Sequence, residues 1–110
     1  MRKDDIVRLK HMLDAAKEAR SFASNKKRSD LDANRQLTLA LLKDIEIIGE
    51  AASKVSEETK AKYPSMPWLD IINMRNRLIH AYFDIDLEIV WDTVTKDIPP
   101  LIAELEKIVG

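Results

Sequence analysis

The sequence predicts an all-α protein, a bundle of four or five helices. Apolar residues recur at three- and four-residue intervals along most of the chain, and no stretch alternates apolar and polar residues as a half-buried strand would. The 110 residues include only two glycines and four prolines, too few turn-forming residues for a many-stranded sandwich or barrel. A chain of this length has room for one hydrophobic core, so we expect residues 1–110 to form a single domain.

The composition limits the classes of function. Because 18 Lys and Arg oppose 19 Asp and Glu, a large basic surface that coats nucleic acid is excluded, and any such site must be small. The absence of cysteine excludes disulfides, thiolate nucleophiles and cysteine-ligated zinc. Two histidines, His11 and His80, cannot form a metal cage of several imidazoles, so we expect no metal and no cofactor. No stretch resembles a signal peptide or a membrane span, which favours a cytoplasmic protein.

The first expected helix covers residues 4–24, where the apolar positions share one helical face. They are Leu9, Met12, Leu13, Ala16, Ala19, Phe22 and Ala23. His11 falls outside this face and is expected at the surface. The basic stretch Lys26-Lys27-Arg28 follows, and we expect a solvated turn there, with contact to RNA or to an acidic partner as the alternative.

A long helix is expected from about residue 31 to residue 56, with its cap within Ser29–Asp32. Its apolar stripe consists of Leu37, Leu41, Ile45, Ile48, Ala52 and Val55. Leu39, Leu42 and Ile47 add apolar surface on other sides, which in so small a chain suggests a second copy as the cover and hence a homodimer. Gly49 and its small neighbours would let another helix approach closely.

The remaining elements are predicted from caps and prolines. A short helix begins at Ser56 and ends at Tyr63-Pro64, and the next begins at Pro67 and runs to about Phe83. Carboxylates at Asp84 and Asp86 precede a further helix. Pro99-Pro100 should break or kink that helix before a terminal helical segment, residues 101–109.

The segment 70–84 carries the candidate chemistry. On a continuous helix Arg75 falls in the middle of an apolar arc, with Asn76 and His80 on its polar edge. A buried guanidinium requires a partner, which is either a carboxylate such as Glu46 or Glu50 or an anionic ligand in a cleft. Arginine binds phosphate through two parallel hydrogen bonds, and histidine serves as acid or base near neutral pH, so a phosphate site is one of two open interpretations.

Residues 75–82, RNRLIHAY, resemble the R-x4-H-x-Y signature of HEPN-domain ribonuclease toxins, and more specifically the HepT group. The flanking stretches 48–68 and 75–91 are also similar to that group. The resemblance implies a HEPN-like bundle and a metal-independent endoribonuclease that acts on RNA as a homodimer. It further implies that Arg75, Asn76 and His80 of both chains line one composite cleft.

The same resemblance implies how the protein is silenced. In the HepT group a nucleotidyltransferase antitoxin, MntA, transfers AMP to the motif tyrosine, which here is Tyr82. The added phosphate and bulk would exclude RNA from a neighbouring cleft. Glu50 is a candidate accessory residue that could partner Arg75 or tune His80.

Two alternatives remain open at this point. A HEPN module that does not cut, serving as a binding or regulatory subunit of a minimal nucleotidyltransferase, agrees with the near-zero net charge. The intact set of Arg75, Asn76, His80 and Tyr82 favours the enzyme instead. The other alternative is a helical dimerisation domain in which Arg75 only pairs with an acid.

Overall fold

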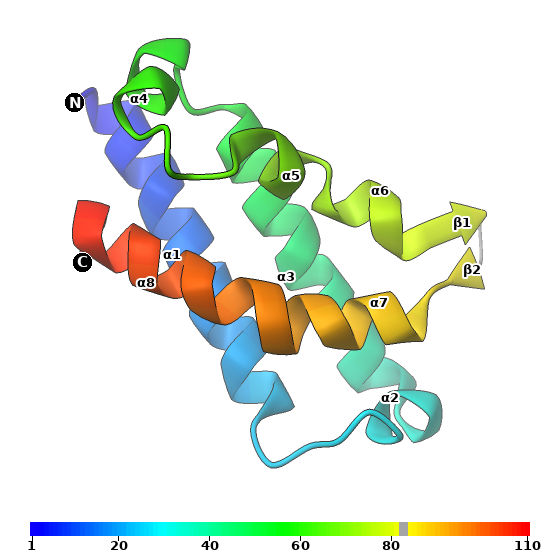
Figure 1. Ribbon diagram of the computed structural model, residues 1–110. Coiled ribbons are helices and arrows are strands. Elements are labelled where there is room, and N and C mark those ends of the chain that lie inside the picture. The colour runs from blue at the N-terminus through cyan, green and yellow to red at the C-terminus, as the bar shows by residue number, and fades with distance from the viewer. Residues whose placement is uncertain (82–83) are drawn as a thin grey trace.

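Helices form nearly all the secondary structure of the computed structural model, which describes residues 1–81 and 84–110. Two long helices, α1 (Lys3–Ala23) and α3 (Arg35–Ser53), lie side by side, and a third long helical unit crosses them (Figure 1). That unit consists of α7 (Leu87–Asp92), a π-helical turn (Thr93–Asp97) and α8 (Ile98–Val109). The all-α class predicted from the sequence is therefore confirmed.

Short elements complete the bundle. Helix α2 (Asp30–Ala33) precedes α3, and three short helices follow it: α4 (Glu57–Lys62), α5 (Trp68–Ile72) and α6 (Met74–Leu78). Strands β1 (Ile79–Ala81) and β2 (Asp84–Ile85) form a small antiparallel pair at one edge of the molecule (Figure 1). The long helices surround a core whose largest fully buried apolar side chains are Leu9, Met12, Leu41, Ile45, Ile48, Leu78, Val90, Val94, Ile98 and Leu105.

Side-chain caps decide where several helices begin. Ser56 accepts a hydrogen bond from the Thr59 backbone N–H at 3.3 Å, and Asp86 accepts one from Ile89 at 3.1 Å, as the sequence predicted for both helix starts. The second long helix differs from the prediction, because Ser29 makes no cap bond and the chain is extended at Asn34. The Asn34 side chain accepts from Leu37 N–H at 3.1 Å, so α3 begins at Arg35.

The expected helix from Pro67 to Phe83 is the main error of the sequence prediction. The chain leaves the helix after Ile72, resumes it at Met74 and changes to a strand at Ile79. Strand pairing holds the new direction, because Ile79 pairs with Ile85 and the Asp86 N–H donates to the Leu78 carbonyl at 2.7 Å.

Close packing against α3 explains the end of α5. A Cβ added at Gly49 would lie 3.2 Å from the Ile72 carbonyl oxygen and 3.4 Å from that of Ile71, so only glycine allows this approach without a shift. The Trp68 indole N–H, at the start of α5, donates to the carbonyl oxygens of Lys60 and Tyr63 at 3.2 and 3.0 Å. The α5 helix is thus fixed at both ends. The close approach predicted for Gly49 is confirmed.

Two other differences concern a side chain and a helix break. Phe22, expected on the apolar face of the first helix, is 39% exposed. Pro99-Pro100 do not interrupt the last helical unit, because both lie in the first turn of α8, where missing N–H groups cost little. The π-helical turn before them keeps the chain helical, and Thr95 Oγ1 donates there to the Trp91 carbonyl at 2.7 Å.

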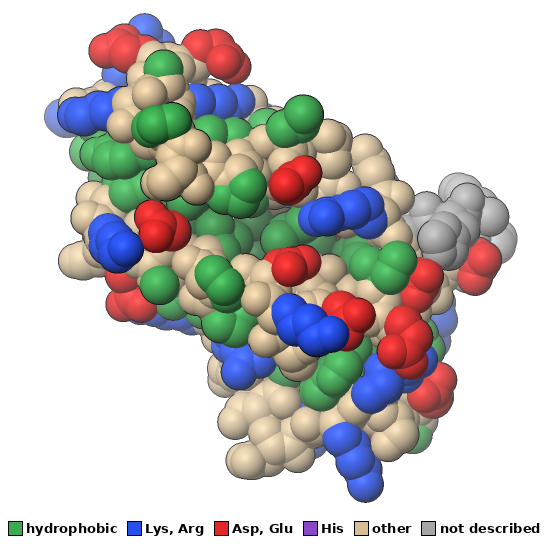
Figure 2. Space-filling view, in the orientation of Figure 1, with side chains coloured by type: hydrophobic (Ala, Val, Ile, Leu, Met, Phe, Trp, Pro, Cys, Tyr) green, Lys and Arg blue, Asp and Glu red, His purple; other side chains and the backbone are tan. Residues whose placement is uncertain are grey.

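The surface charges are interspersed and many are paired. Figure 2 shows acidic and basic side chains mixed over the face that Figure 1 presents. Arg28, expected in a solvated basic turn, is bound by Asp32 at 2.8 Å and by Glu88 at 2.7 Å, so it joins α2 to α7. Among the described residues, no helix is both long and apolar enough to cross a membrane.

Asp5 attaches α4 to α1. Its buried carboxylate accepts hydrogen bonds from the Ser56 N–H at 2.9 Å, the Ser56 hydroxyl at 2.6 Å and the Thr59 hydroxyl at 2.7 Å. The hydroxyl bonds from Ser56 and Thr59 are the main reason that the pKa of Asp5 is lowered to about 2. The charged form is therefore the one that stabilises the fold.

Asp44 of α3 is a buried acid whose pKa is shifted in the opposite direction, upwards. Its side chain is 2% exposed, and its Oδ2 atom makes no hydrogen bond to any described residue. Burial, together with the hydrogen bond and negative charge of Glu18 on α1, raises the pKa of Asp44 to about 7. Between pH 4 and pH 7 the folded protein therefore keeps a proton at Asp44 that the unfolded chain releases.

We expect Asp5→Asn to lower the free energy of unfolding at pH 7 by about 2 kcal/mol or more, because the amide replaces a charged acceptor of three hydrogen bonds. The lowered pKa means that the wild type loses this stabilisation as the pH falls through about 2. Urea unfolding at several pH values from 7 to 2 should show that the difference in unfolding free energy between the wild type and Asp5→Asn becomes smaller. The neighbouring exposed Asp4→Asn is the control, and equal effects of both variants would contradict the role of Asp5.

We expect Asp44→Asn to remove a decline of stability that the wild type shows as the pH rises from about 4 to about 7. The raised pKa makes the folded state bind more protons than the unfolded state in this range, so the wild type loses stability with rising pH. Melting temperatures across this range measure the effect. Asp14→Asn, at an exposed position of α1, should keep the wild-type slope, and parallel profiles for Asp44→Asn and wild type would contradict the assignment.

Candidate functional site

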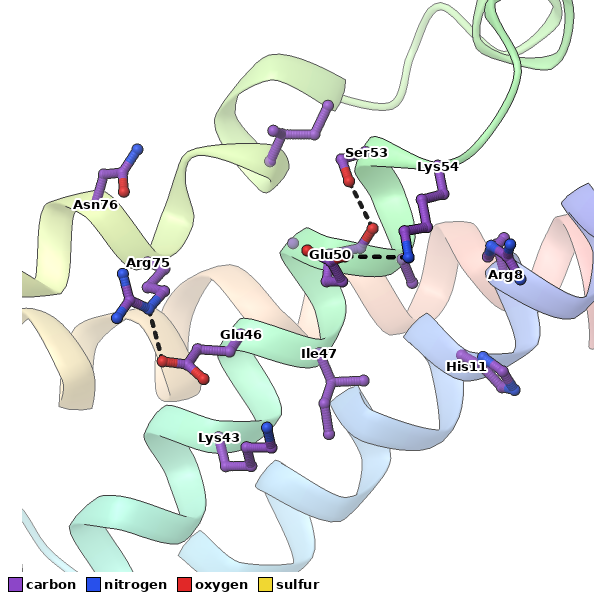
Figure 3. A pocket seen from close by; sticks show the side chains of 13 residues that line it. Arg8, His11, Lys43, Glu46, Ile47, Glu50, Ser53, Lys54, Arg75 and Asn76 are labelled. Atoms are coloured by element: carbon purple, nitrogen blue, oxygen red, sulfur yellow. Dashed lines mark hydrogen bonds and ion pairs between the residues drawn. The ribbon is translucent and has the colours of Figure 1, made fainter.

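A cavity of about 710 Å³ lies over α3, between α1 and the α5–α6 segment (Figure 3). Its size is within the range of roughly 300–1,000 Å³ typical of small-ligand sites. Two of the motif residues, Arg75 and Asn76, line it from α6. The full lining is Arg8, His11, Lys43, Glu46, Ile47, Gly49, Glu50, Ala51, Ser53, Lys54, Ile72, Arg75 and Asn76.

Arg75 reaches this cavity because other residues of the segment occupy the core. Ile71, Met74 and Leu78 are buried at one helical spacing, which leaves Arg75 at the edge of the apolar face, with 49% of its side chain exposed. The expectation that Arg75 lies at the centre of a buried arc is therefore wrong. On one continuous helix Met74 would lie outside the apolar arc, whereas in the structure it is a core residue directly before Arg75.

The Arg75 side chain is held by an acid from α3. Its Nε donates to Glu46 Oε1 at 2.6 Å, so of the two carboxylates predicted as partners, Glu46 is the one that the structure shows. The two Nη nitrogens make no hydrogen bond to a described residue. A phosphate can therefore approach the guanidinium from the cavity while Glu46 keeps its position.

Glu50 lines the same cavity but has another partner. It is 69% exposed and pairs with Lys54, one helical turn later, at 3.2 Å. The predicted contact between Glu50 and Arg75 is not formed, because Glu46 lies one turn earlier on α3 and takes that position.

The motif histidine and tyrosine follow α6. His80 lies in β1, and the strand register places it at a bulge, since Ile79 pairs with Ile85 and Ala81 with Asp84. The His80 side chain is outside the described part of the structure, and so is the whole of Tyr82. The structure thus brings Arg75 and Asn76 together and places the His80 backbone directly after their helix.

Several residues of the cavity are not predicted from the sequence, among them Arg8, His11 and Lys43. Arg8 and His11 come from one face of α1, and Lys43 comes from α3 (Figure 3). His11 is exposed as predicted, but its place opposite Arg75 was not foreseen. The three-residue spacing of Arg8 and His11 was the available signal, although nothing in a sequence shows what such a pair faces.

The cavity has a positive surplus. Four basic residues, Arg8, Lys43, Lys54 and Arg75, oppose two acidic ones, Glu46 and Glu50, in a chain of net charge −1. In the part of the chain that the structure describes, no three His, Asp or Glu side chains are grouped to hold a metal ion. The donors present, guanidinium, ammonium, imidazole and carboxamide, suit a phosphate group.

Comparison with known proteins agrees with this chemistry. A family model described as "Ribonuclease HepT-like" matches residues 12–108. A protein of Thermococcus cleftensis named a probable ribonuclease HepT is 38% identical over 79 residues, which are 72% of this chain and 72% of that protein.

Longer matches come from Methanocaldococcus jannaschii. One protein is named as a gamma-glutamylcyclotransferase and, provisionally, as an RNase. It is 38% identical over 108 residues, which are 98% of this chain. The chain spans about half of that relative, 49% of its length. Another protein, named provisionally as an RNase, is 32% identical over 108 residues, 89% of its own length. No solved structure matches. Since the family model covers nearly the whole chain, this protein belongs to the HepT-like ribonuclease family.

Proposed function

We propose that the chain is a cytoplasmic endoribonuclease toxin of a HepT–MntA-type pair. Residues 1–110 would form one domain, and the enzyme would act as a homodimer without a metal. One observation carries the proposal: Arg75 and Asn76, adjacent residues of the family motif, line one cavity with a surplus of positive charge. A phosphodiester of RNA is the ligand that this combination fits, given the family to which the chain belongs.

The reaction is a transfer of the phosphate to the neighbouring ribose. The 2′-oxygen attacks the phosphorus and its proton passes to one His80, while the bond from phosphorus to the 5′-oxygen breaks. A second His80 gives its proton to the leaving 5′-oxygen. The products are a 2′,3′-cyclic phosphate and a 5′-hydroxyl. Arg75 stabilises the charge that develops on the phosphorane, and Asn76 orients the phosphate or His80.

The homodimer follows from the need for two imidazoles. Each chain contributes one motif histidine, so a base and an acid at one phosphate require two chains. The cavity face of α3 also exposes apolar surface to solvent: Leu39 is 43% exposed, and Ile47 is only partly buried. A second copy packed beside this face would cover Leu39 and bring the two motifs together.

The ion pair with Glu46 does not by itself explain why an arginine occupies position 75. A pair whose side chains are 49% and 31% exposed stabilises a fold by at most about 1 kcal/mol, so a purely structural role would gain little. An exposed arginine in a cavity is instead accessible to a phosphate. This favours the enzyme over a dimerisation domain in which Arg75 only pairs with an acid.

AMP transfer to Tyr82 by an MntA-like nucleotidyltransferase would silence the enzyme. Tyr82 is two residues beyond His80, so each AMP would bring a negative charge and a bulky base close to the composite cleft. Both would compete with RNA, the charge by repelling its phosphates and the base by occupying space.

We expect Arg75→Ala and His80→Ala each to reduce RNA cleavage by about 10²-fold or more, because each removes a group that acts in the transition state. Arg77→Ala is the matched control, since Arg77 is an exposed residue of the same helix that does not line the cavity. Cleavage is measured on purified protein in EDTA, with analysis of the product ends.

A requirement for added metal, or other product ends, would contradict this mechanism. If the wild type cuts no RNA and does not arrest growth without its partner, the non-catalytic subunit is the correct function.

We expect incubation with the partner nucleotidyltransferase and ATP to add AMP to the wild type and to Tyr63→Phe, but not to Tyr82→Phe. These are the two tyrosines of the chain, so each variant is the control for the other. Intact-mass spectrometry followed by peptide mapping measures the adduct. An adduct that persists in Tyr82→Phe would overturn the assignment of the acceptor.

A further inference from the structure

Glu46 holds one edge of the motif arginine and leaves the other edge open. Arg75 Nε donates to Glu46 Oε1 at 2.6 Å, and the two Nη nitrogens lie on the far side of the guanidinium from this contact (Figure 3). Neither Nη atom bonds to a residue within 1–81 or 84–110. Because 49% of the Arg75 side chain is exposed, the open edge can bind a phosphate through two parallel hydrogen bonds.

The helix that carries Arg75 cannot by itself orient so long a side chain. Helix α6 has only five residues, between the break after Ile72 and the strand that begins at Ile79. Burial of Met74 and Leu78 fixes its backbone, but the arginine side chain is flexible and loses rotamer freedom when it is ordered. Arg75 therefore needs a contact from another element to keep one orientation.

Glu46 provides this contact from a rigid element. It lies within α3, a helix of 19 residues, between Ile45 and Ile48, which are both fully buried. The Glu46 side chain is 31% exposed, whereas Glu50, the other acid of the cavity, is 69% exposed and pairs with Lys54. Of the two cavity acids, Glu46 is thus the one that can fix Arg75.

We infer that Glu46 is a positioning residue of the ribonuclease, which acts on the reaction through Arg75. The inference rests on the proposed function and adds a residue to the same site. The carboxylate binds Nε before RNA arrives, so the Nη edge already points in one direction when negative charge develops on the phosphorane. In this role Glu46 needs only to accept a hydrogen bond, and it transfers no proton.

The charge of Glu46 has a second effect, of opposite sign. A carboxylate beside the guanidinium lowers the attraction of this site for a phosphate, while the orientation that it gives Arg75 raises the rate. Removing the carboxylate should therefore lower kcat without weakening the binding of RNA. Damage to the fold would instead weaken binding as well.

The first test separates the reach of residue 46 from its charge. The kcat and KM for cleavage are measured in EDTA on a fluorescent oligouridylate of about 12 nucleotides. We expect Glu46→Ala to lower kcat about tenfold, because Arg75 loses its fixed orientation. Glu46→Gln keeps an oxygen acceptor at the same reach and should stay within about threefold of the wild type. Glu46→Asp keeps the charge but is one methylene shorter, so it should resemble Glu46→Ala.

The second test asks whether Glu46 acts through Arg75. In the Arg75→Ala background, Glu46→Ala should change the residual rate by less than about twofold, because the group that Glu46 positions is already gone. Binding of the same probe is measured by anisotropy in the His80→Ala background, where the probe stays intact. There Glu46→Gln should bind as tightly as the parent or up to about threefold more tightly.

Glu88→Ala is the matched control for the loss of an ion pair. Glu88 Oε1 accepts from Arg28 Nε at 2.7 Å, the same two atom types as in the pair of Arg75 with Glu46, and Glu88 does not line the cavity. This variant should keep the kcat and KM of the wild type. Circular dichroism melting checks that all variants fold.

The possible failures are distinguishable. If Glu46→Asp is active and Glu46→Gln is not, the charge of residue 46 is what matters, and the inference is wrong. It is also wrong if Glu46→Ala slows cleavage as much in the Arg75→Ala background as in the wild type. If Glu46→Ala cuts like the wild type while Arg75→Ala does not cut, the inference fails and the proposed function stands. If the wild type cuts no RNA, both are wrong.

Discussion

The position of the motif depends on the contact between Gly49 and the end of α5. The carbonyl oxygens of Ile71 and Ile72 approach α3 so closely that a Cβ at residue 49 would lie 3.2 Å from the nearer one. Glycine inside a helix costs about 1 kcal/mol relative to alanine, and here that cost permits the close packing. Because α5 ends against α3, the chain restarts as α6 beside it, and Arg75 comes within 2.6 Å of Glu46.

Two buried acids hold the opposite side of the cavity. Asp5 binds α4 through Ser56 and Thr59, and it lies one turn before Arg8 on α1. Asp44 lies next to Lys43 in sequence but is buried towards α1, where it meets Glu18. The same helix contacts that fix α1 against α3 therefore also set how far Arg8 and His11 of α1 lie from Arg75. Stability and the shape of the cavity depend on the same residues.

The sequence predicts the features that depend on local chemistry. Caps at Ser56 and Asp86 and the close approach at Gly49 follow from residue types and spacing. For Arg75 the residue types indicate only that a carboxylate or an anion is needed, and the packing of α6 against α3 selects Glu46 over Glu50. The break after Ile72 does not follow from local chemistry, because it results from packing against another helix. Asp5 could not be told from Asp4 for the same reason, since its role depends on α4, about fifty residues away. Arg8 and His11 line the cavity only because α1 packs against α3, which no local pattern indicates.

The change from helix to strand after Leu78 matters for the chemistry that we propose. On one helix, residues five apart point about 140° away from each other, so Arg75 and His80 of one chain would face different directions. In the structure His80 is the extra residue of a bulge between Ile79 and Ala81, and helical spacing no longer constrains it. A bulge next to a motif is a common way to redirect a side chain without moving the scaffold. The motif thus combines a helix that carries Arg75 and Asn76 with a strand whose bulge takes the His80 backbone out of the helical repeat, and the two-chain site that we propose does not need all three groups on one helical face.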